Sequence, residues 1–177
     1  MKFRCVTLVV ALFAGVLPIC AQTTPAVSPR DVTFCELSRD PAAFNHQIVR
    51  LTGFVTHGFE DFGVSDPECG TQGFGIWLMY GGKTESNTMY CCPGEGSRAA
   101  RPNLLKAEDI EIPLVEDQIF QSFTALLKKE ADSTVRATLV GRFFSGDKVM
   151  GGTEGTQAFW RGYGHMGCCS LLAIQQV

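Results

Sequence analysis

The sequence predicts a small, mainly β domain with two helices. Residues 47–57 and 134–143 alternate apolar with polar side chains, which is the pattern of a strand that buries one face. Residues 115–129 instead repeat apolar side chains at helical spacing. With 177 residues, the chain has the length of one domain behind a removable N-terminal segment.

The first helix is expected between Thr33 and Asp40. Thr33 is a residue type that caps helix N-termini, and Pro41 interrupts the helix after Asp40. Residues 47–57 follow as the first strand, in which Gly53 is expected to form a bend or bulge.

Glycine-rich connections separate the next predicted strands. Residues 58–75 are rich in Gly, Asp and Phe and are expected to form a long connection. The second strand is expected at 74–80 and a short third strand at 88–92, followed by a loop over 93–102.

The second helix is expected over 115–129. Acidic residues Glu116 and Asp117 lie in its first turn and basic residues Lys128 and Lys129 in its last, which complements the helix dipole. The apolar residues that recur three or four positions apart are Val115, Ile119, Phe123, Leu126 and Leu127.

The remaining chain adds a strand at 134–143, a glycine-rich excursion over 145–167 and a final strand at 168–177. Helix, three strands, helix, two strands is the element order of the oligonucleotide/oligosaccharide-binding (OB) fold. This fold is a five-stranded, partly open barrel, and its helix is expected between strands three and four. We therefore expect one OB-like barrel domain over residues 31–177.

Both ends of this domain resemble a protein family. Cys35-Glu36-Leu37, Asp40-Pro41, Phe44 and Val49-Arg50-Leu51-Thr52-Gly53 are similar to the beginning of small exported bacterial proteins with an OB-type fold, most of them uncharacterised. Gly164-His165-Met166-Gly167-Cys168-Cys169-Ser170 resembles the ending of a subgroup with the same cysteine doublet. These motifs are structural, so the resemblance implies the fold and no particular activity.

The N-terminus predicts export. Basic Lys2 and Arg4 precede an apolar run over 6–16, and Pro18 and the small Ala21 follow, as in a secretory signal peptide. We expect cleavage after Ala21, so that residues 1–21 are the signal and 22–30 a flexible leader. The mature protein is then expected in the periplasm or outside the cell, with no membrane span.

A lipid anchor is the alternative at this end of the chain. Leu17-Pro18-Ile19-Cys20 loosely resembles the lipobox of bacterial lipoproteins. Ile19 stands where that motif has a small residue, which argues against lipidation of Cys20.

Charge argues against nucleic acid as a partner. The chain has 15 Lys and Arg and 18 Asp and Glu, and loss of Lys2 and Arg4 with the signal leaves 13 basic residues and a net charge of about −5. Binding to phosphate backbones requires a basic face that this composition does not supply.

Six of the eight cysteines remain after cleavage, and they could form three disulfides with 15 possible connectivities. An oxidising compartment favours such bonds. Adjacent Cα atoms are about 3.8 Å apart, below the usual disulfide range of about 4.4–6.8 Å. We therefore expect one bridge between the doublets rather than a bond within one, with Cys35 and Cys69 bonded to the remaining members of the doublets. The six are Cys35, Cys69 and the doublets Cys91-Cys92 and Cys168-Cys169.

A metal-binding or thiol-redox protein is the alternative function. Cys91, Cys92, His165, Cys168 and Cys169 could supply thiolate and imidazole ligands. Adjacent ligands are poorly spaced around one tetrahedral ion, and no Cys-x-x-Cys motif opens a helix. We expect structural disulfides, no metal and no cofactor.

Ligands of OB folds contact strands two and three and the loops between strands one and two and strands four and five. The residues expected to bind a ligand here are Trp77, Trp160, Arg161 and Tyr163, with Trp160 as a stacking platform for a sugar or base. The alternative is that Trp77 and Phe159 belong to the core and that Trp160 and Tyr163 only cover the loop. The other residues in these regions are His57, Glu60, Asp61, Asp66, Tyr80, Phe159 and His165.

The sequence does not predict an enzyme. No Gly-x-Ser-x-Gly nucleophile elbow is present, although His57, Asp61 and a serine would make a triad by residue type. The acidic Glu60, Asp61, Asp66 and Glu68 lack the spacing of a calcium loop. We expect a non-catalytic binding or structural module of the cell envelope or extracellular space, with an envelope protein, peptide or glycan as its partner.

Overall fold

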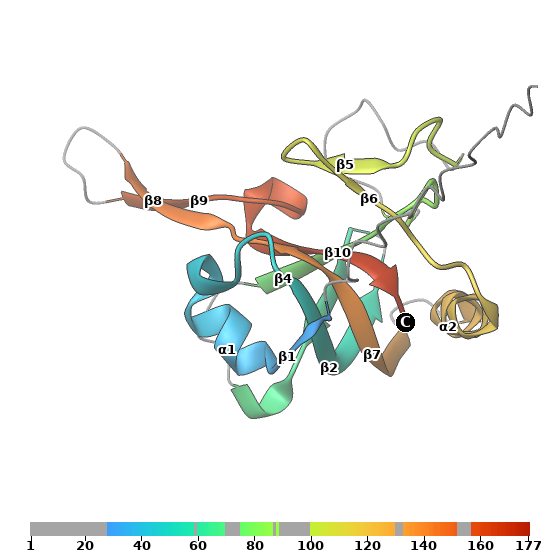
Figure 1. Cartoon of the computed structure of the whole chain (residues 1–177). Helices are drawn as coiled ribbons and strands as arrows, with labels where there is room; N and C mark the ends of the chain where they lie inside the picture. Colours follow the sequence, from blue (N-terminus) through green and yellow to red (C-terminus); the bar gives the residue numbers. More distant parts are fainter. Residues whose placement is uncertain are drawn as a thin grey trace, which may run out of the picture.

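The computed structural model describes residues 28–58, 60–69, 75–86, 88, 100–129, 133–151 and 157–177. The described chain is mainly β, and five of its strands close into a barrel (Figure 1). The barrel strands are β2 (Ile48–His57), β3 (Phe62–Ser65), β4 (Gly75–Tyr80), β7 (Ser133–Phe144) and β10 (Cys169–Gln176).

The strand order is that of an OB-like barrel. Around the barrel it runs β2, β3, β4, β10, β7, and β7 pairs again with β2. The pairing of β4 with β10 is parallel and the other pairings in the barrel are antiparallel. Helix α2 (Gln118–Lys129) lies between the third and fourth barrel strands, as predicted, and β1 (Arg30–Val32) adds alongside β2.

The predicted number of barrel strands, five, is correct, but one of these strands is not the predicted one. The second strand is β3, inside the segment 58–75 that was expected to be a connection, and the predicted strand at 74–80 is the third. Thr88 lies outside any strand, and the rest of the predicted strand 88–92 falls outside the described residues. Strand β3 is short and includes Gly63, and its buried residues are Phe62 and Val64.

The first helix forms where it was predicted. Helix α1 (Phe34–Arg39) begins with a capping box: Thr33 Oγ1 accepts from the Glu36 backbone N–H at 3.2 Å, and a Glu36 carboxylate oxygen accepts from the Thr33 N–H at 2.7 Å. A short 3₁₀ helix, η1 (Pro41–Phe44), follows and leads into β2.

Helix α2 begins later than predicted. Asp117 accepts a hydrogen bond from the backbone N–H of Phe120 at 2.9 Å, so the helix starts after Asp117 rather than at residue 115. Its buried face consists of Phe120, Phe123 and Leu127. The predicted apolar set therefore belongs to two faces, because Val115, Ile119 and Leu126 are at least half exposed.

The core fills the barrel interior. Apolar side chains point inward from alternate positions of each strand, such as Leu51 and Val55 of β2 and Leu139 of β7. Strand β10 is buried on both faces over residues 171–174. No helix among the described residues is long and apolar enough to cross a membrane.

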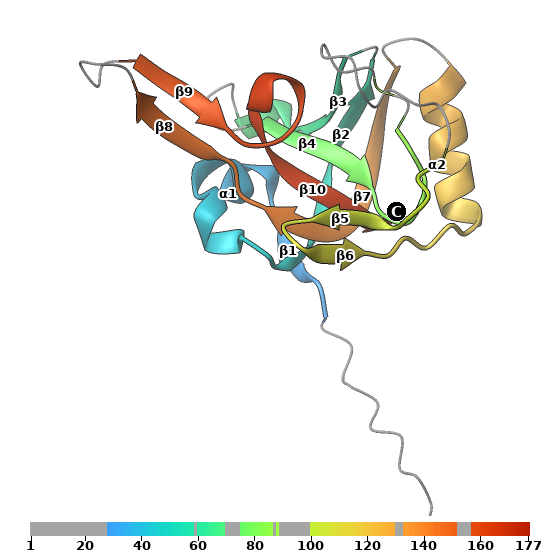
Figure 2. The same cartoon turned by 90° about the horizontal axis from the view of Figure 1, so that it is seen from above.

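The segment expected to be a glycine-rich loop over 145–167 contains a hairpin. Strands β8 (Asp147–Gly151) and β9 (Gln157–Arg161) pair with each other and extend away from the barrel, on the side opposite α2 (Figures 1 and 2). A second hairpin, β5 (Leu105–Ala107) and β6 (Ile110–Ile112), precedes α2. Two 3₁₀ helices complete the fold, η2 (Pro67–Cys69) and η3 (His165–Gly167).

The disulfides differ from the predicted arrangement. Cys35 of α1 is bonded to Cys69 of η2, with Cα atoms 5.2 Å apart. Cys168 is bonded to Cys169, with Cα atoms 3.7 Å apart, so the predicted bridge from this doublet to the other is wrong. Cys168 has a right-handed helical backbone at the end of η3, which removes the alternation of side chains expected within a strand. Cys91 and Cys92 lie outside the described residues.

Candidate functional site

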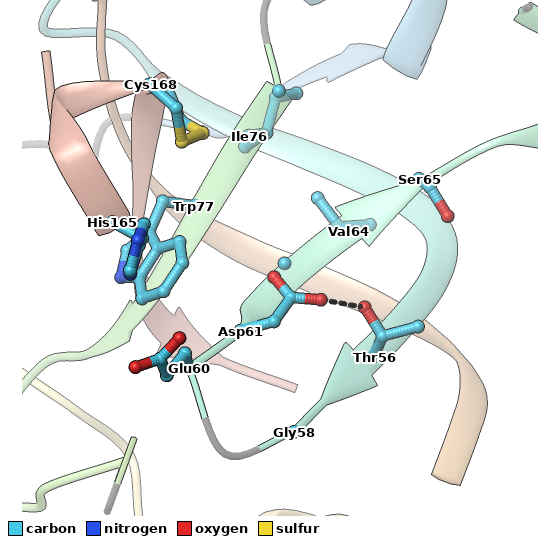
Figure 3. Close-up of a pocket in the computed structure, with 13 residues that line it drawn as sticks. Thr56, Gly58, Glu60, Asp61, Val64, Ser65, Ile76, Trp77, His165 and Cys168 are labelled. Atoms are coloured by element: carbon cyan, nitrogen blue, oxygen red, sulfur yellow. Dashed lines mark hydrogen bonds between the residues drawn. A yellow bond between two sulfur atoms is a disulfide. The ribbon is translucent and has the colours of Figure 1, made fainter. Parts of the chain in front are cut away.

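A pocket of about 600 Å³ lies on the outer face of β3 and β4. The connection from β2 to β3 forms one side, and η3 with the start of β10 forms the other (Figure 3). Its described lining comprises Thr56, Gly58, Glu60, Asp61, Gly63, Val64, Ser65, Gly75, Ile76, Trp77, His165, Cys168 and Cys169.

Two glycines in the pocket lining, Gly63 and Gly75, have no side chain to occupy the cavity. Gly63 lies across from Thr56 on one neighbouring strand and Trp77 on the other, and Gly75 lies across from Cys169. A Cβ added at Gly63 would meet its nearest neighbours, an Asp61 oxygen and a backbone oxygen, at 3.4 Å. A Cβ at residue 63 would therefore make ordinary van der Waals contacts, and the glycine leaves its place to the pocket.

Trp77 forms a wall of the pocket rather than an open platform. The side chain is 3% exposed, so the alternative interpretation of Trp77 as a core residue is correct. Gly164 covers one face of the indole, and His165 lies beside the ring (Figure 3). The polypeptide after β9 therefore folds over the outer face of β4 and encloses one side of the cavity.

The rim of the pocket is acidic. Glu60 and Asp61 are both exposed, and Asp61 accepts a hydrogen bond from the Thr56 hydroxyl at 3.2 Å (Figure 3). The described lining contains no lysine or arginine. The fixed charges at the opening are thus negative and favour a positively charged group over an anion.

The opposite wall carries an imidazole and a disulfide. His165 Nδ1 is buried and has no hydrogen-bond partner within the described part of the chain. Cys168 is half-buried and Cys169 is nearly buried. The Cys168 sulfur lies 3.8 Å from the carbonyl oxygen of Tyr163.

The described lining of the pocket contains only part of the predicted ligand set. Trp77 lines the pocket, whereas Arg161 and Tyr163 are outside its described lining. Trp160 belongs to β9, where it is the register partner of Lys148. The sequence did not predict that Gly63 and Gly75 line a pocket, because a residue without a side chain adds nothing to a pattern of apolar and polar positions.

Tyr163 belongs to a hydrogen-bonded cluster outside the pocket. Its hydroxyl donates to one carboxylate oxygen of Glu108 at 2.5 Å, and His46 Nε2 lies 2.7 Å from the other oxygen. These two hydrogen bonds, that of Tyr163 more than that of His46, lower the pKa of Glu108 below its usual value. The cluster attaches the tip of the β5–β6 hairpin to the barrel. His46 and Glu108, which are in contact there, are 62 positions apart in the sequence.

A second, smaller pocket of about 380 Å³ lies between α2 and the end of β4. His57 and Tyr80, two of the residues considered as ligand contacts, line this pocket instead of the first. His57 Nε2 is 2.7 Å from the carbonyl oxygen of Ser86, to which it donates. The hypothetical triad of His57, Asp61 and a serine is not assembled, because His57 and Asp61 line different pockets.

The acidic residues of the β2–β3 and β3–β4 connections have separate roles. Asp66 accepts a hydrogen bond from the Glu68 backbone N–H at 3.0 Å, whereas Glu60 and Asp61 line the pocket. Within the ranges that the structure describes, no three His, Cys, Asp or Glu residues are grouped as a metal ion requires.

Fold and pocket together define an OB-like barrel with an acidic cavity on the strand face where this fold takes its ligands. Neither a family model, nor a curated protein, nor a solved structure matches this chain. The resemblance to exported bacterial proteins therefore stays a prediction.

Proposed function

We propose that this chain is an exported, non-catalytic binding module that holds a small ligand, or one side chain of a peptide or envelope protein, in the pocket above β3 and β4. The observation that carries this proposal is the cavity itself. Its volume of about 600 Å³ lies within the usual range of ligand sites, roughly 300–1,000 Å³. It also involves the strands and loops through which OB folds bind their ligands.

The lining favours a ligand that combines a positive charge with an apolar part. Glu60 and Asp61 supply negative charge at the rim, while Val64, Ile76 and Trp77 supply apolar surface deeper in the cavity. A primary amine or a basic side chain with its aliphatic stem has this combination.

Disulfides and the N-terminal sequence support export. Disulfides such as Cys35–Cys69 form and persist mainly in oxidising compartments. Residues 1–21 have the basic, apolar and small-residue order of a signal peptide. The periplasm and the extracellular space both meet these conditions.

A binding role is preferred over hydrolysis because of what lines the cavity. Its described hydroxyl groups are those of Thr56 and Ser65, and each donates its hydrogen bond to another acceptor, Asp61 or the Phe54 carbonyl oxygen. A nucleophile requires a base that accepts its proton. His165, the imidazole of this lining, makes no hydrogen bond to either hydroxyl among the described residues.

The test is a ligand screen by NMR with isotopically labelled mature protein. Small amines, carboxylates, mono- and disaccharides and tripeptides are added, and amide shifts are followed. Gly63→Leu should place a side chain in the pocket and abolish the shifts around it, because residue 63 lines the cavity and a Cβ there makes no contact shorter than 3.4 Å. Thr138→Leu is the matched control, since Thr138 is an exposed strand residue on β7 outside the described pocket lining.

Shifts that survive Gly63→Leu would place the ligand elsewhere and contradict the proposal. A library that produces no shift at the pocket residues in the unsubstituted protein would do so as well.

A further inference from the structure

The two described disulfides differ in what they connect. Cys35 and Cys69 are 34 positions apart, and their bond joins α1 to η2. Cys168 and Cys169 are neighbours, so their bond joins no separate parts of the fold.

This difference determines how strongly each bond is coupled to folding. A disulfide stabilises a fold mainly by closing a loop in the unfolded chain, and the effect grows with loop length. A bond between neighbours closes no such loop, because the two residues are adjacent in the unfolded chain too. The coupling between a disulfide and folding is reciprocal. Folding therefore stabilises the Cys35–Cys69 bond against reduction and stabilises the Cys168–Cys169 bond much less.

The position of the second bond makes it reachable. Both cysteines line the pocket, where Cys168 is half-buried and Cys169 is buried. Gly75 lies close to the Cys169 sulfur, and a Cβ on residue 75 would come within 3.0 Å of that sulfur and cover it. The carbonyl oxygen of Tyr163, 3.8 Å from the Cys168 sulfur, is placed to accept a weak hydrogen bond from a thiol.

We propose that Cys168–Cys169 is a thiol–disulfide exchange site that takes a dithiol through the pocket. A thiolate of the dithiol attacks the Cys168 sulfur, the bond to Cys169 breaks, and Cys169 leaves as the thiolate. The second thiol of the dithiol then attacks the mixed disulfide and releases Cys168. Two electrons and two protons pass to the cysteines, which become thiols, and the dithiol departs as a disulfide.

The test uses the full mature protein in buffers of increasing ratio of reduced to oxidised dithiothreitol. Free thiols are blocked with iodoacetamide at each ratio, and the digested peptides are identified by mass. Cys168 and Cys169 should become alkylated at a ratio more than about tenfold below that needed for Cys35 and Cys69. Circular dichroism at the first midpoint should equal that of the oxidised protein.

Opening of both bonds at the same ratio, or of Cys35–Cys69 first, would overturn the proposal. A non-reducing digest in which Cys168 or Cys169 is bonded to Cys91 or Cys92 would also overturn it. Alkylation measures which cysteines are free thiols, so the result does not depend on whether the pocket binds a ligand. Failure of the ligand screen is therefore distinguishable from failure of the exchange site.

Discussion

Gly164 lies against the indole of Trp77 so closely that a Cβ on Gly164 would come within 2.5 Å of ring carbons. Gly164 also has a φ of +74°, a backbone conformation that side chains disfavour. The contact holds the segment before β10 onto the outer face of β4, and so forms one side of the pocket.

Gly164→Ala should destabilise the protein by about 2–4 kcal/mol, since it combines the left-handed strain of a non-glycine residue with an overlap against a buried ring. Urea unfolding followed by circular dichroism measures this change. Gly63→Ala is the matched control, because its Cβ contacts begin at 3.4 Å. Equal stability of the two variants would show that the Trp77 contact does not constrain residue 164.

Glu60→Gln combined with Asp61→Asn should weaken binding of n-butylammonium roughly 3- to 10-fold at low ionic strength, the effect of two exposed charges. Binding of n-butanol should not change. NMR titration of both probes provides the affinities, and added salt should reduce the difference between the proteins. Glu111→Gln, an exposed residue of β6 outside the described pocket lining, is the control for loss of a single negative charge elsewhere. Equal loss with both probes would mean that shape, and not charge, selects the ligand.

Cys35→Ser with Cys69→Ser should lower the free energy of unfolding by about 3–4 kcal/mol, the loop-closure contribution for residues this far apart. The corresponding fall in Tm is roughly 10 °C. Cys168→Ser with Cys169→Ser should leave Tm nearly unchanged under oxidising conditions, because no loop is lost. Differential scanning calorimetry of the two double variants makes the comparison. A larger fall for the second variant would indicate that the adjacent pair supports the fold through packing.

Glu108 should stabilise the protein above the unfolded-state pKa of a glutamate, about 4.3. Its folded pKa is lowered by the hydrogen bonds of Tyr163 and His46, so this stability is lost as the pH falls from that value through the lower folded pKa. Tyr163→Phe and His46→Gln should each raise the pKa of Glu108, because the hydrogen bond of the tyrosine is the largest single cause of the lowering and that of the histidine is the next. Carboxyl NMR titration reads the pKa directly. An unchanged value in Tyr163→Phe would show that the tyrosine does not act on the carboxylate.

The parts of the fold that the sequence predicts are those with long, regular patterns. Strands β2 and β7 are paired over ten register positions, from Ile48 with Arg142 to His57 with Ser133, and their alternation is visible in the sequence. Strand β3 has only four residues and includes Gly63, so pairing with both neighbours, rather than pattern, makes it a strand.

The start of α2 and the bond within the second doublet depend on local backbone geometry. Exposed Val115 and Ile119 share the helical spacing of the buried residues, which displaces the predicted start towards the N-terminus. The Cys168–Cys169 bond depends on Cys168 leaving the strand geometry. The cavity depends on two glycines and on a long-range fold of the chain over Trp77, and neither is visible as a sequence pattern.

The position of strand β10 in the sequence determines when the barrel can close. It lies between β4 and β7, which do not pair with each other, and it is the element that joins them. All other barrel strands precede it in the chain. During translation the facing edges of β4 and β7 stay unpaired until the ribosome has passed Gln176. The barrel therefore closes only after its other four strands have been made.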